Sequence, residues 1–414
     1  MKIGSSSSEG ATSQQGAVGR VLFVLTGRCN LHCAYCYQTA RTPASLPWEA
    51  LQAAIDLALA GNSPRIGLAF SGGEPLLEFE LLRRAVEYAE AVCPPGKRIR
   101  FSIGTNGLLL SDEIADFLTR HHFAVQLSFD GLAAAQNLRG TRTFEVLDRL
   151  LDSLRVAHPR LFNHNLSIAM TVLPSTVSHL ADSVQYFIGK GIRELRVAPG
   201  LVHDSTWEPG GIRDLDSQFD RVAELSRSCL ERTGEVPVSF LRKSSEHAVD
   251  AERRSALCGG LSGRALVVDA DGAAYPCPLL AEAGPASGPG SPAALLTSLG
   301  MGNIGEGGFA GRRAAVLART RQLVPPDWDA HRHSSYGKCR ECRYYSRCPV
   351  CPAFVPGTSV DEGELRVPDF TCAFNQVLLK YRDLFPCAPG AFAKLLPSEG
   401  ADPIEPLERY LRDV

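Results

Sequence analysis

The stretch VLFVLTGRCNLHCAYC, residues 21–36, joins an apolar run to three closely spaced cysteines. Val21–Thr26 is short, apolar and β-branched at several positions, which is typical of a strand buried in a parallel sheet. The cysteines Cys29, Cys33 and Cys36 follow directly in a more polar segment. We therefore expect a strand that delivers three thiols to its carboxyl end.

Strand-like and helix-like segments alternate from this stretch to about residue 235. Helical stripes near 51–59, 82–89, 112–119, 143–156 and 177–190 separate the apolar runs that predict the next five strands. These strands are Ile66–Phe70, Arg98–Ile103, Phe123–Phe129, Leu166–Val172 and Glu194–Val197. Six such units imply an α/β fold with a parallel sheet and right-handed crossovers. Because a complete barrel of this type has eight units, we expect an open, partial (β/α)6 TIM-like barrel.

Polar or glycine-rich clusters fall at the ends of the first four predicted strands. CNLHCAYC (29–36) follows the first, GGEP (72–75) the second, TNG (105–107) the third, and SFDG (128–131) ends the fourth. Parallel barrels carry their chemistry at the carboxyl ends of their strands, so these clusters are predicted to meet at one mouth. Taken singly, the last three are more often ordinary turn and helix-cap sequences.

The overall composition excludes several classes of protein. The 414 residues are enough for two or three domains, and 43 basic against 45 acidic residues give a net charge of -2. This balance argues against binding to nucleic acid or to an anionic membrane. No apolar run approaches the length of a membrane span, and the first 19 residues lack the apolar core of a secretory signal. We therefore expect a cytoplasmic protein.

Thirteen cysteines are unusual in such a protein, and they cluster in two places. Since disulfides are disfavoured in a reducing compartment, clustered thiols there more often bind metal or do redox chemistry. The second cluster lies in a segment organised by cysteine spacing. The predicted regions are a disordered tail 1–19, the barrel 20–235, a cysteine-rich domain 236–375 with a β-hairpin at 265–275 and a flexible insertion 281–294, and a helical segment 376–414.

Three thiolates within eight residues leave one iron of a cubane [4Fe–4S] cluster open to a ligand. A zinc site would need a fourth ligand, for which His32 is a candidate. The stretch resembles the CxxxCxxC signature of radical S-adenosylmethionine (SAM) enzymes, in which an aromatic residue, here Tyr35, precedes the third cysteine. The resemblance implies that Cys29, Cys33 and Cys36 hold a [4Fe–4S] cluster. It also implies reductive cleavage of SAM to a 5′-deoxyadenosyl radical that abstracts a hydrogen atom.

The same resemblance implies residues that bind the cofactor SAM. Gly72, Gly73, Glu74 and Pro75 would bind its methionyl amino group, with Glu74 accepting from the ammonium. Asn106, Ser128 and Asp130 are candidates for ribose or methionyl contacts, alongside Tyr35. Arg139 matches a position where an arginine would pair with the SAM carboxylate, although a solvated surface arginine is the alternative.

Seven cysteines after residue 257 resemble the SPASM domain, whose cysteines hold two auxiliary [4Fe–4S] clusters. The resemblance assigns Cys258, Cys277 and Cys351 to an inner cluster, and Cys339, Cys342, Cys348 and Cys372 to an outer one. The last CxxC gap is one residue shorter than the family's, which affects the assignment of Cys351. A structural zinc on Cys339, Cys342, Cys348 and Cys351 is the alternative. Seven thiolates leave one inner iron open, with Cys229, Asp250 or Glu252 as further candidates.

The resemblance implies a peptide or protein substrate, and most simply a modification or cross-link in a ribosomally made peptide. Oxidation of a small molecule or of a sulfatase residue is the alternative, and Pro278 after Cys277 counts against the sulfatase branch, which carries an acidic residue there. A zinc-binding interaction protein on an inactive barrel is the reading from a different class. Expected partners are an electron donor such as flavodoxin or ferredoxin, and a separate leader-peptide-binding protein.

Overall fold

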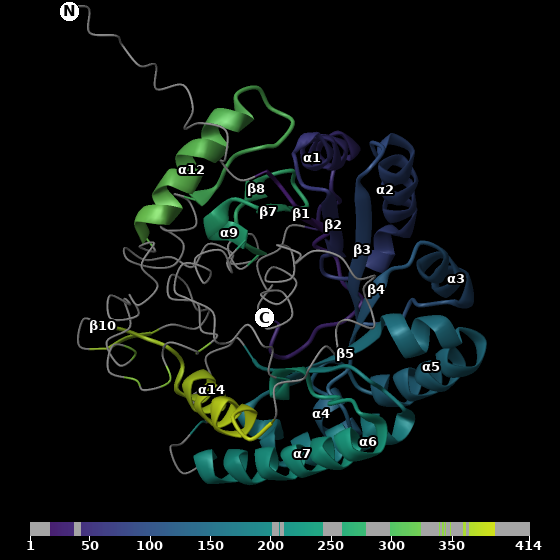
Figure 1. Cartoon of the computed structure of the whole chain (residues 1–414), viewed down its shortest axis with the longest axis vertical. Coiled ribbons are helices and arrows are strands. Elements are labelled where there is room, and N and C mark those ends of the chain that lie inside the picture. Colours follow the sequence, from purple (N-terminus) through teal and green to yellow (C-terminus); the bar gives the residue numbers. More distant parts are fainter. Residues whose placement is uncertain are drawn as a thin grey trace, which may run out of the picture.

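The chain forms an open, partial barrel with helices on its outside (Figure 1). The computed structural model describes residues 17–36, 43–200, 207, 211–242, 259–278, 299–323, 339, 342, 344, 348, 359–361 and 364–385. Some predictions lie outside these residues: nearly all of the tail, the insertion 281–294, Cys258, Cys351, Asp250, Glu252 and the segment after residue 385.

One eight-stranded sheet has the order β6–β5–β4–β3–β2–β1–β7–β8. Its first six strands are parallel and follow the chain order, as predicted. They are β1 (Arg20–Val24), β2 (Arg65–Ser71), β3 (Arg98–Thr105), β4 (Ala124–Ser128), β5 (Leu166–Val172) and β6 (Leu195–Pro199). The expected α/β partial barrel is therefore confirmed, with strand bounds within two or three residues of those predicted.

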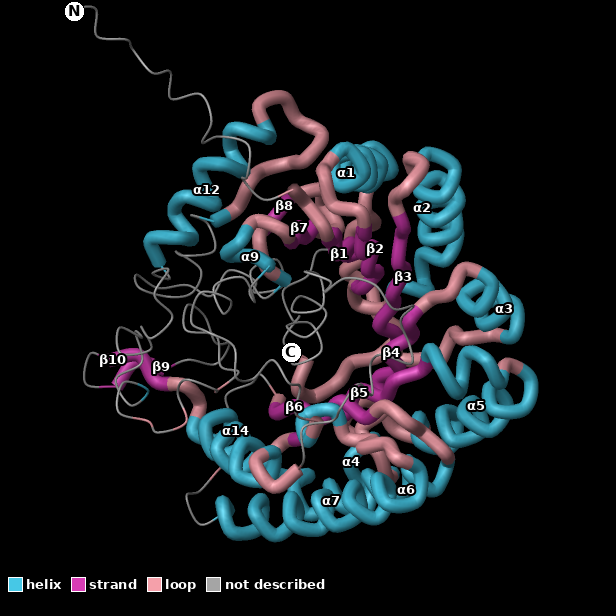
Figure 2. Tube along the Cα trace, viewed as in Figure 1, coloured by secondary structure: helices cyan, strands magenta, loops and turns pink. Residues whose placement is uncertain are grey.

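Amphipathic helices cover the outer face of this sheet (Figure 2). In α1 (Trp48–Ala60) the predicted stripe is the buried face, and the helix ends before Gly61. The other covering helices are α2 (Phe79–Val92), α3 (Asp112–Arg120), α5 (Thr143–Ala157), α6 (Leu180–Lys190) and α7 (Ile212–Thr233), with the short α4 (Ala133–Gln136) before α5. Between sheet and helices, stacked rings of Phe23, Phe70 and Phe123 have centroids 5.6 and 5.9 Å apart.

The predicted hairpin belongs to the barrel sheet. Strand β7 (Ala265–Val268) pairs in parallel with β1, and β8 (Ala274–Tyr275) returns antiparallel to β7. Gly272 has φ of +85° in the connecting turn, where an L side chain would be strained. The sheet therefore crosses residue 235, where the sequence alone indicates a change of domain.

The remaining described elements are α9 (Gly259–Ser262), α12 (Phe309–Leu323), the antiparallel pair β9 (Ser359–Asp361) and β10 (Glu364–Arg366), and α14 (Asp369–Arg382). Helix α14 begins seven residues before the predicted helical segment and carries Cys372. It packs on α7, where the rings of Phe374 and Phe219 lie 5.0 Å apart. Within the described residues, no helix has the length and apolarity needed to cross a membrane.

Candidate functional site

The three cysteines of the first motif lie together in the loop after β1. Cys29, Cys33 and Cys36 are half-buried free thiols. Burial raises the pKa of Cys29 and of Cys33, and the neighbouring thiols raise both further, which shows that the three sulfurs lie within electrostatic reach of one another. The loop is tightly turned, since the Cys36 amide donates to the Cys33 carbonyl at 3.0 Å.

The number of thiols in this loop suits a cluster. A cubane cluster can take one thiolate at each of three irons and leave the fourth iron open to another ligand. A zinc ion would need a fourth protein ligand nearby. His32, the candidate fourth zinc ligand, is exposed. The donor set at this loop therefore fits a [4Fe–4S] cluster.

The loop after β2 is packed directly against the cysteine loop. The Gly73 amide donates to the Thr26 carbonyl at 2.8 Å, and the Glu74 amide donates to the Arg28 carbonyl at 2.9 Å. A Cβ atom on residue 73 would lie 2.1 Å from the Arg28 oxygen, and one on Gly72 would lie 2.6 Å from the Thr26 oxygen. Both glycines are therefore required for this close approach of two loops.

Glu74 connects these loops to the end of β3. Its buried carboxylate accepts from the Leu76 amide at 3.0 Å, the Thr105 hydroxyl at 2.7 Å and the Asn106 amide at 2.7 Å. Burial raises its pKa, while these three donors act in the opposite direction. A carboxylate offers about four lone-pair positions, so one on Oε2 remains for a ligand. Pro75 is buried at the start of the 3₁₀ helix that follows.

Asn106 reaches back to the cysteine loop. Its Nδ2 donates to Asn30 Oδ1 at 2.7 Å and lies 3.9 Å from Cys29 Sγ, while its Oδ1 accepts from the Leu108 amide. Ser128 ends β4 and is half-buried. Within the described part of the chain, its hydroxyl makes no hydrogen bond.

Asp130 and Arg139 form a buried ion pair beside the cysteine loop. Arg139 Nε donates to Asp130 Oδ2 at 3.0 Å and Nη2 donates to Oδ1 at 2.9 Å. Only 11% of the Arg139 side chain and 1% of the Asp130 side chain are exposed, so the alternative of a solvated surface arginine is wrong. The Tyr35 hydroxyl also donates to Asp130, and Thr171 contributes its backbone amide at 2.8 Å. Nothing in the sequence marks Thr171, because it lies on β5 and meets Asp130 only through the sheet.

The structure brings together three of the four cysteines predicted for the outer cluster. Burial raises the pKa of Cys339 to about 11, and the nearby thiols of Cys372 and Cys342 contribute to this rise. The Cys342 amide donates to the Cys339 carbonyl at 3.2 Å. Cys348 is half-buried against the hydrophobic core. Gln376, one helical turn beyond Cys372, donates from Nε2 to its Sγ at 3.2 Å, and this contact was not expected from the sequence.

Of the cysteines predicted for the inner cluster, Cys277 lies within the described residues. Cys277 follows β8 and is half-buried. A Cβ atom on Gly260 would lie 2.7 Å from the Pro276 oxygen and 3.6 Å from Cys277 Cβ, so the residue two places after Cys258 contacts the Cys277 turn. This contact is consistent with Cys258 and Cys277 serving one site.

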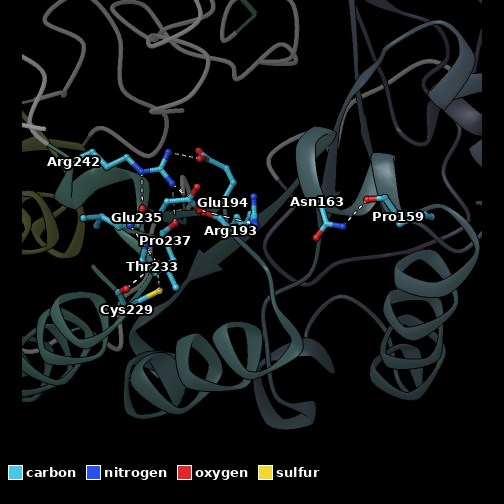
Figure 3. Close-up of polar contacts among 10 residues, drawn as sticks. Pro159, Asn163, Arg193, Glu194, Cys229, Thr233, Glu235, Pro237 and Arg242 are labelled. Atoms are coloured by element: carbon cyan, nitrogen blue, oxygen red, sulfur yellow. Dashed lines mark hydrogen bonds and ion pairs between the residues drawn. The ribbon is translucent and has the colours of Figure 1, made fainter. Parts of the chain in front are cut away.

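Cys229 lies away from this turn. It is on α7, with Sγ 3.6 Å from the Thr233 hydroxyl, near the ion pair of Arg242 and Glu194 (Figure 3). Helix α7 flanks the β6 end of the sheet, whereas Cys277 follows β8 at the opposite edge (Figure 1). The fold therefore argues against Cys229 as a ligand of the inner cluster.

The chain is similar to known proteins in sequence and in fold. Residues 23–187 match the model of the radical SAM superfamily. An uncharacterised protein of Methanocaldococcus jannaschii is 26% identical over 264 residues, which cover 63% of this chain and 85% of that protein. The cysteine-type anaerobic sulfatase-maturating enzyme of Clostridium perfringens is 22% identical over 340 residues, which cover 77% and 84% of the two chains.

A solved structure shares the fold over most of the chain. The structure described as native anSMEcpe with bound AdoMet and Cp18Cys peptide aligns with a TM-score of 0.64 at 20% sequence identity. The alignment covers 88% of this chain and 96% of that one. The likeness therefore extends beyond the 165 or so residues of the barrel match and includes the region that carries the later cysteines.

Proposed function

We propose, from the premise that this chain is an enzyme with a radical SAM domain, that it modifies a peptide or protein by hydrogen-atom abstraction. When bound, the [4Fe–4S] cluster and SAM together supply a one-electron cleavage and a carbon-centred radical that attacks an unactivated C–H bond. The chain's part is to hold these groups, orient the substrate and exclude water. The observation that carries the proposal is the hydrogen-bonded mouth in which the loops after β1, β2 and β3 surround three thiols.

In this proposal Cys29, Cys33 and Cys36 hold the barrel cluster, and the neighbouring loops hold SAM. Gly72 and Gly73 let the loop after β2 approach the cysteine loop closely, and Glu74 retains one acceptor position for the methionyl ammonium. Pro75 fixes the turn after this acceptor. The remaining predicted contacts are Asn106, Ser128, Arg139 and Tyr35. Since the Tyr35 hydroxyl donates to Asp130, Tyr35 would contact SAM through its backbone or ring.

Two of these side chains keep groups available for a ligand. The Ser128 hydroxyl is half-buried at the end of β4, where a ribose or methionyl group would pass. Arg139 uses Nε and Nη2 within the protein, and no hydrogen bond of Nη1 is found among the described residues. Nη1 is therefore the atom that we assign to the SAM carboxylate.

The C-terminal cysteines are proposed to hold two auxiliary clusters. Cys339, Cys342, Cys348 and Cys372 form the outer set, supported by the electrostatic contact of three of them. Cys258, Cys277 and Cys351 form the inner set, supported by the contact between Gly260 and Cys277. Seven thiolates for two cubane clusters leave one inner iron open, which is where a substrate thiolate or amine would bind.

The substrate class rests on the relatives. One is named as a sulfatase-maturating enzyme, and the structural neighbour holds a peptide. We favour a peptide or protein modification, most simply in a ribosomally made peptide. Oxidation of a sulfatase residue is the second candidate, supported by the same names. The residue after Cys277 is Pro278, which cannot exchange a proton, so that branch would require its base elsewhere.

Partners and location follow from this chemistry. A one-electron reductant such as flavodoxin or ferredoxin would be needed, and a separate leader-binding protein would be needed if the substrate has a leader peptide. Thiolate-held clusters persist in a reducing compartment, which supports a cytoplasmic location.

Iron and acid-labile sulfide per chain, measured after anaerobic reconstitution, test the cofactors. Three clusters predict about twelve of each and one cluster predicts about four. Formation of 5′-deoxyadenosine with dithionite then tests SAM cleavage, and no formation at full iron loading would contradict the proposal.

Peptide panels test the substrate. A sulfatase-type peptide whose target serine loses two hydrogens supports the second candidate. A mass change only in peptides encoded beside this gene supports the first. An unchanged mass in both sets, with SAM cleavage intact, directs the search to small molecules.

A further inference from the structure

We infer that Asp130 is a positioning residue that holds Tyr35 and Arg139 in one buried unit and does not itself contact SAM. This inference rests on the proposed function, since it concerns the loop that would hold the barrel cluster. It replaces the sequence-based interpretation of Asp130 as a ribose or methionyl contact.

The acceptor positions of Asp130 are all used within the chain. Its Oδ2 accepts from the Tyr35 hydroxyl and from Arg139 Nε at 3.0 Å. Its Oδ1 accepts from Arg139 Nη2 at 2.9 Å and from the Thr171 amide at 2.8 Å. Four donors fill the roughly four lone-pair positions of a carboxylate, and only 1% of the side chain is exposed. A ligand hydroxyl therefore finds no free acceptor on Asp130, whereas Glu74 accepts from three donors and keeps one position.

This unit connects the cysteine loop to the loop after β4 in three places. Besides the hydroxyl of Tyr35, the Ala34 amide donates to the Leu138 carbonyl at 2.8 Å. A Cβ atom on Gly140 would lie 2.9 Å from Leu31 Cδ2, so the two loops are also in van der Waals contact there. The segment between Cys33 and Cys36 is thereby held by contacts within the chain itself.

The loop after β4 is itself rigidly held. The Asp130 amide donates to Gln136 Oε1 at 2.9 Å, and Gln136 Nε2 donates to the Thr143 hydroxyl at 3.0 Å. Gln136 is fully buried, so this bridge is protected from water. Through Asp130, the hydrogen bonds to β4 and α5 therefore help to fix the position of the cysteine loop.

Charge explains why the pair is ionic. The guanidinium of Arg139 lies over the ring of Tyr35, with its carbon 5.4 Å from the ring centre, and within electrostatic reach of the Cys33 sulfur. A cluster with thiolate ligands adds negative charge at this place. Asp130 holds the compensating cation by two hydrogen bonds, and Nη1 makes no hydrogen bond within the part of the chain that the structure describes.

Two variants separate positioning from direct contact. In Tyr35→Phe, a chelator should remove the iron of the barrel cluster at least about fivefold faster than in the wild type, which is the ratio expected from one lost hydrogen bond. The affinity for SAM should stay within about twofold of the wild-type value. In Asp130→Asn, release should be faster and SAM should also bind about tenfold more weakly or worse, because Arg139 is no longer held. The barrel cluster is followed by the change in its reduced electron paramagnetic resonance signal when SAM is added.

Tyr88→Phe is the matched control, since the Tyr88 hydroxyl donates to Asp56 at 2.7 Å on the outer face, and it should match the wild type. Weaker SAM binding in Asp130→Asn with unchanged iron release in both variants would mean direct contact and overturn the inference. Unchanged behaviour in both measurements would also overturn it.

The alkylation rate of Cys33 in the iron-free full chain, measured by mass spectrometry, keeps the test independent of cluster loading. Tyr35→Phe should react faster than the wild type, and equal rates would contradict the inference. If the wild type never acquires a barrel cluster, the proposed function fails while this comparison still decides whether the loop is held.

Discussion

The two groups of cysteines are supported in different ways. The loop that carries Cys29, Cys33 and Cys36 is hydrogen-bonded to the loop after β2 and to the unit around Asp130. In the C-terminal group, the sulfur of Cys372 accepts from Gln376, and Cys339 interacts with the neighbouring thiols. The sequence there, KCRECRYYSRCPVC (338–351), offers few apolar side chains to bury.

This difference indicates how far each site is formed by the chain and how far it depends on metal. At the barrel mouth the chain forms the site by itself, because glycine close approach and buried carboxylates hold the loops. In the C-terminal group we expect the metal to contribute folding free energy, as it does in small domains that lack an apolar core. The barrel should therefore fold without iron, and the C-terminal cysteine segment should depend on it.

Replacing one cysteine in each group should give the largest and most different effects. Cys33→Ala should abolish SAM cleavage and remove about four irons per chain. Cys339→Ala should also lose about four irons but should retain SAM cleavage without substrate. Cys93→Ala is the control, since Cys93 lies on the outer side of the barrel beside Pro94 and Lys97 and should keep full iron. Loss of SAM cleavage in Cys339→Ala would show that the two groups of cysteines do not act independently.

Removal of all iron from the full chain should have the second largest effect, and it should change hydrogen exchange in one of the two regions only. Amides of β1 to β5 should keep their slow hydrogen exchange, because their core is apolar and independent of metal. Amides around Cys339 and Cys342 should exchange much faster than in the loaded protein. Mass spectrometry of hydrogen exchange on both forms measures this, and equal protection at these cysteines would show that the chain holds them unaided.

The contact of Gln376 with Cys372 should have a smaller, electronic effect. A hydrogen bond to a cluster sulfur stabilises the more negative, reduced state, so Gln376→Leu should lower the potential of one auxiliary cluster. One hydrogen bond of typical strength corresponds to about 20–60 mV. A redox titration followed by electron paramagnetic resonance checks it, with Gln52→Leu, which removes a surface bond to Tyr88, as the control. An unchanged potential would assign Gln376 to helix packing alone.

The smallest effect is expected at a partly exposed group of ion pairs on the barrel's outside. Lys190 Nζ lies 2.6 Å from Asp148 and 2.9 Å from Asp152. Hydrogen bonds from Lys190 and Tyr186 lower the pKa of Asp148, so its contribution is present at neutral pH and is lost as pH falls below about 4. Lys190→Met should cost about 0–1 kcal/mol in unfolding free energy at pH 7. A cost of about 3–5 kcal/mol, the size expected on breaking a buried ion pair such as Asp130–Arg139, would remove the distinction between the two environments.

Much of the barrel was predictable from short segments of sequence. The apolar runs and the helical stripes are local patterns, so they indicated six parallel strands and their helices. The spacing of Cys29, Cys33 and Cys36 and the glycines of GGEP are equally local, and they located the mouth because parallel strands end on one side.

The partners of the polar groups were decided by the tertiary structure. Arg139 was compatible with a surface residue or a ligand contact until the sheet brought Asp130 and Thr171 beside it. Likewise β7 pairs with β1 across about 240 residues of chain, which a local hairpin pattern cannot reveal. Residue type and spacing are local properties, so the sequence alone identified the candidate residues. The fold sets which of them can face a ligand, since the buried carboxylates of Glu74 and Asp130 accept from Thr105, Asn106 and Thr171, which lie 31 to 41 residues away in the chain.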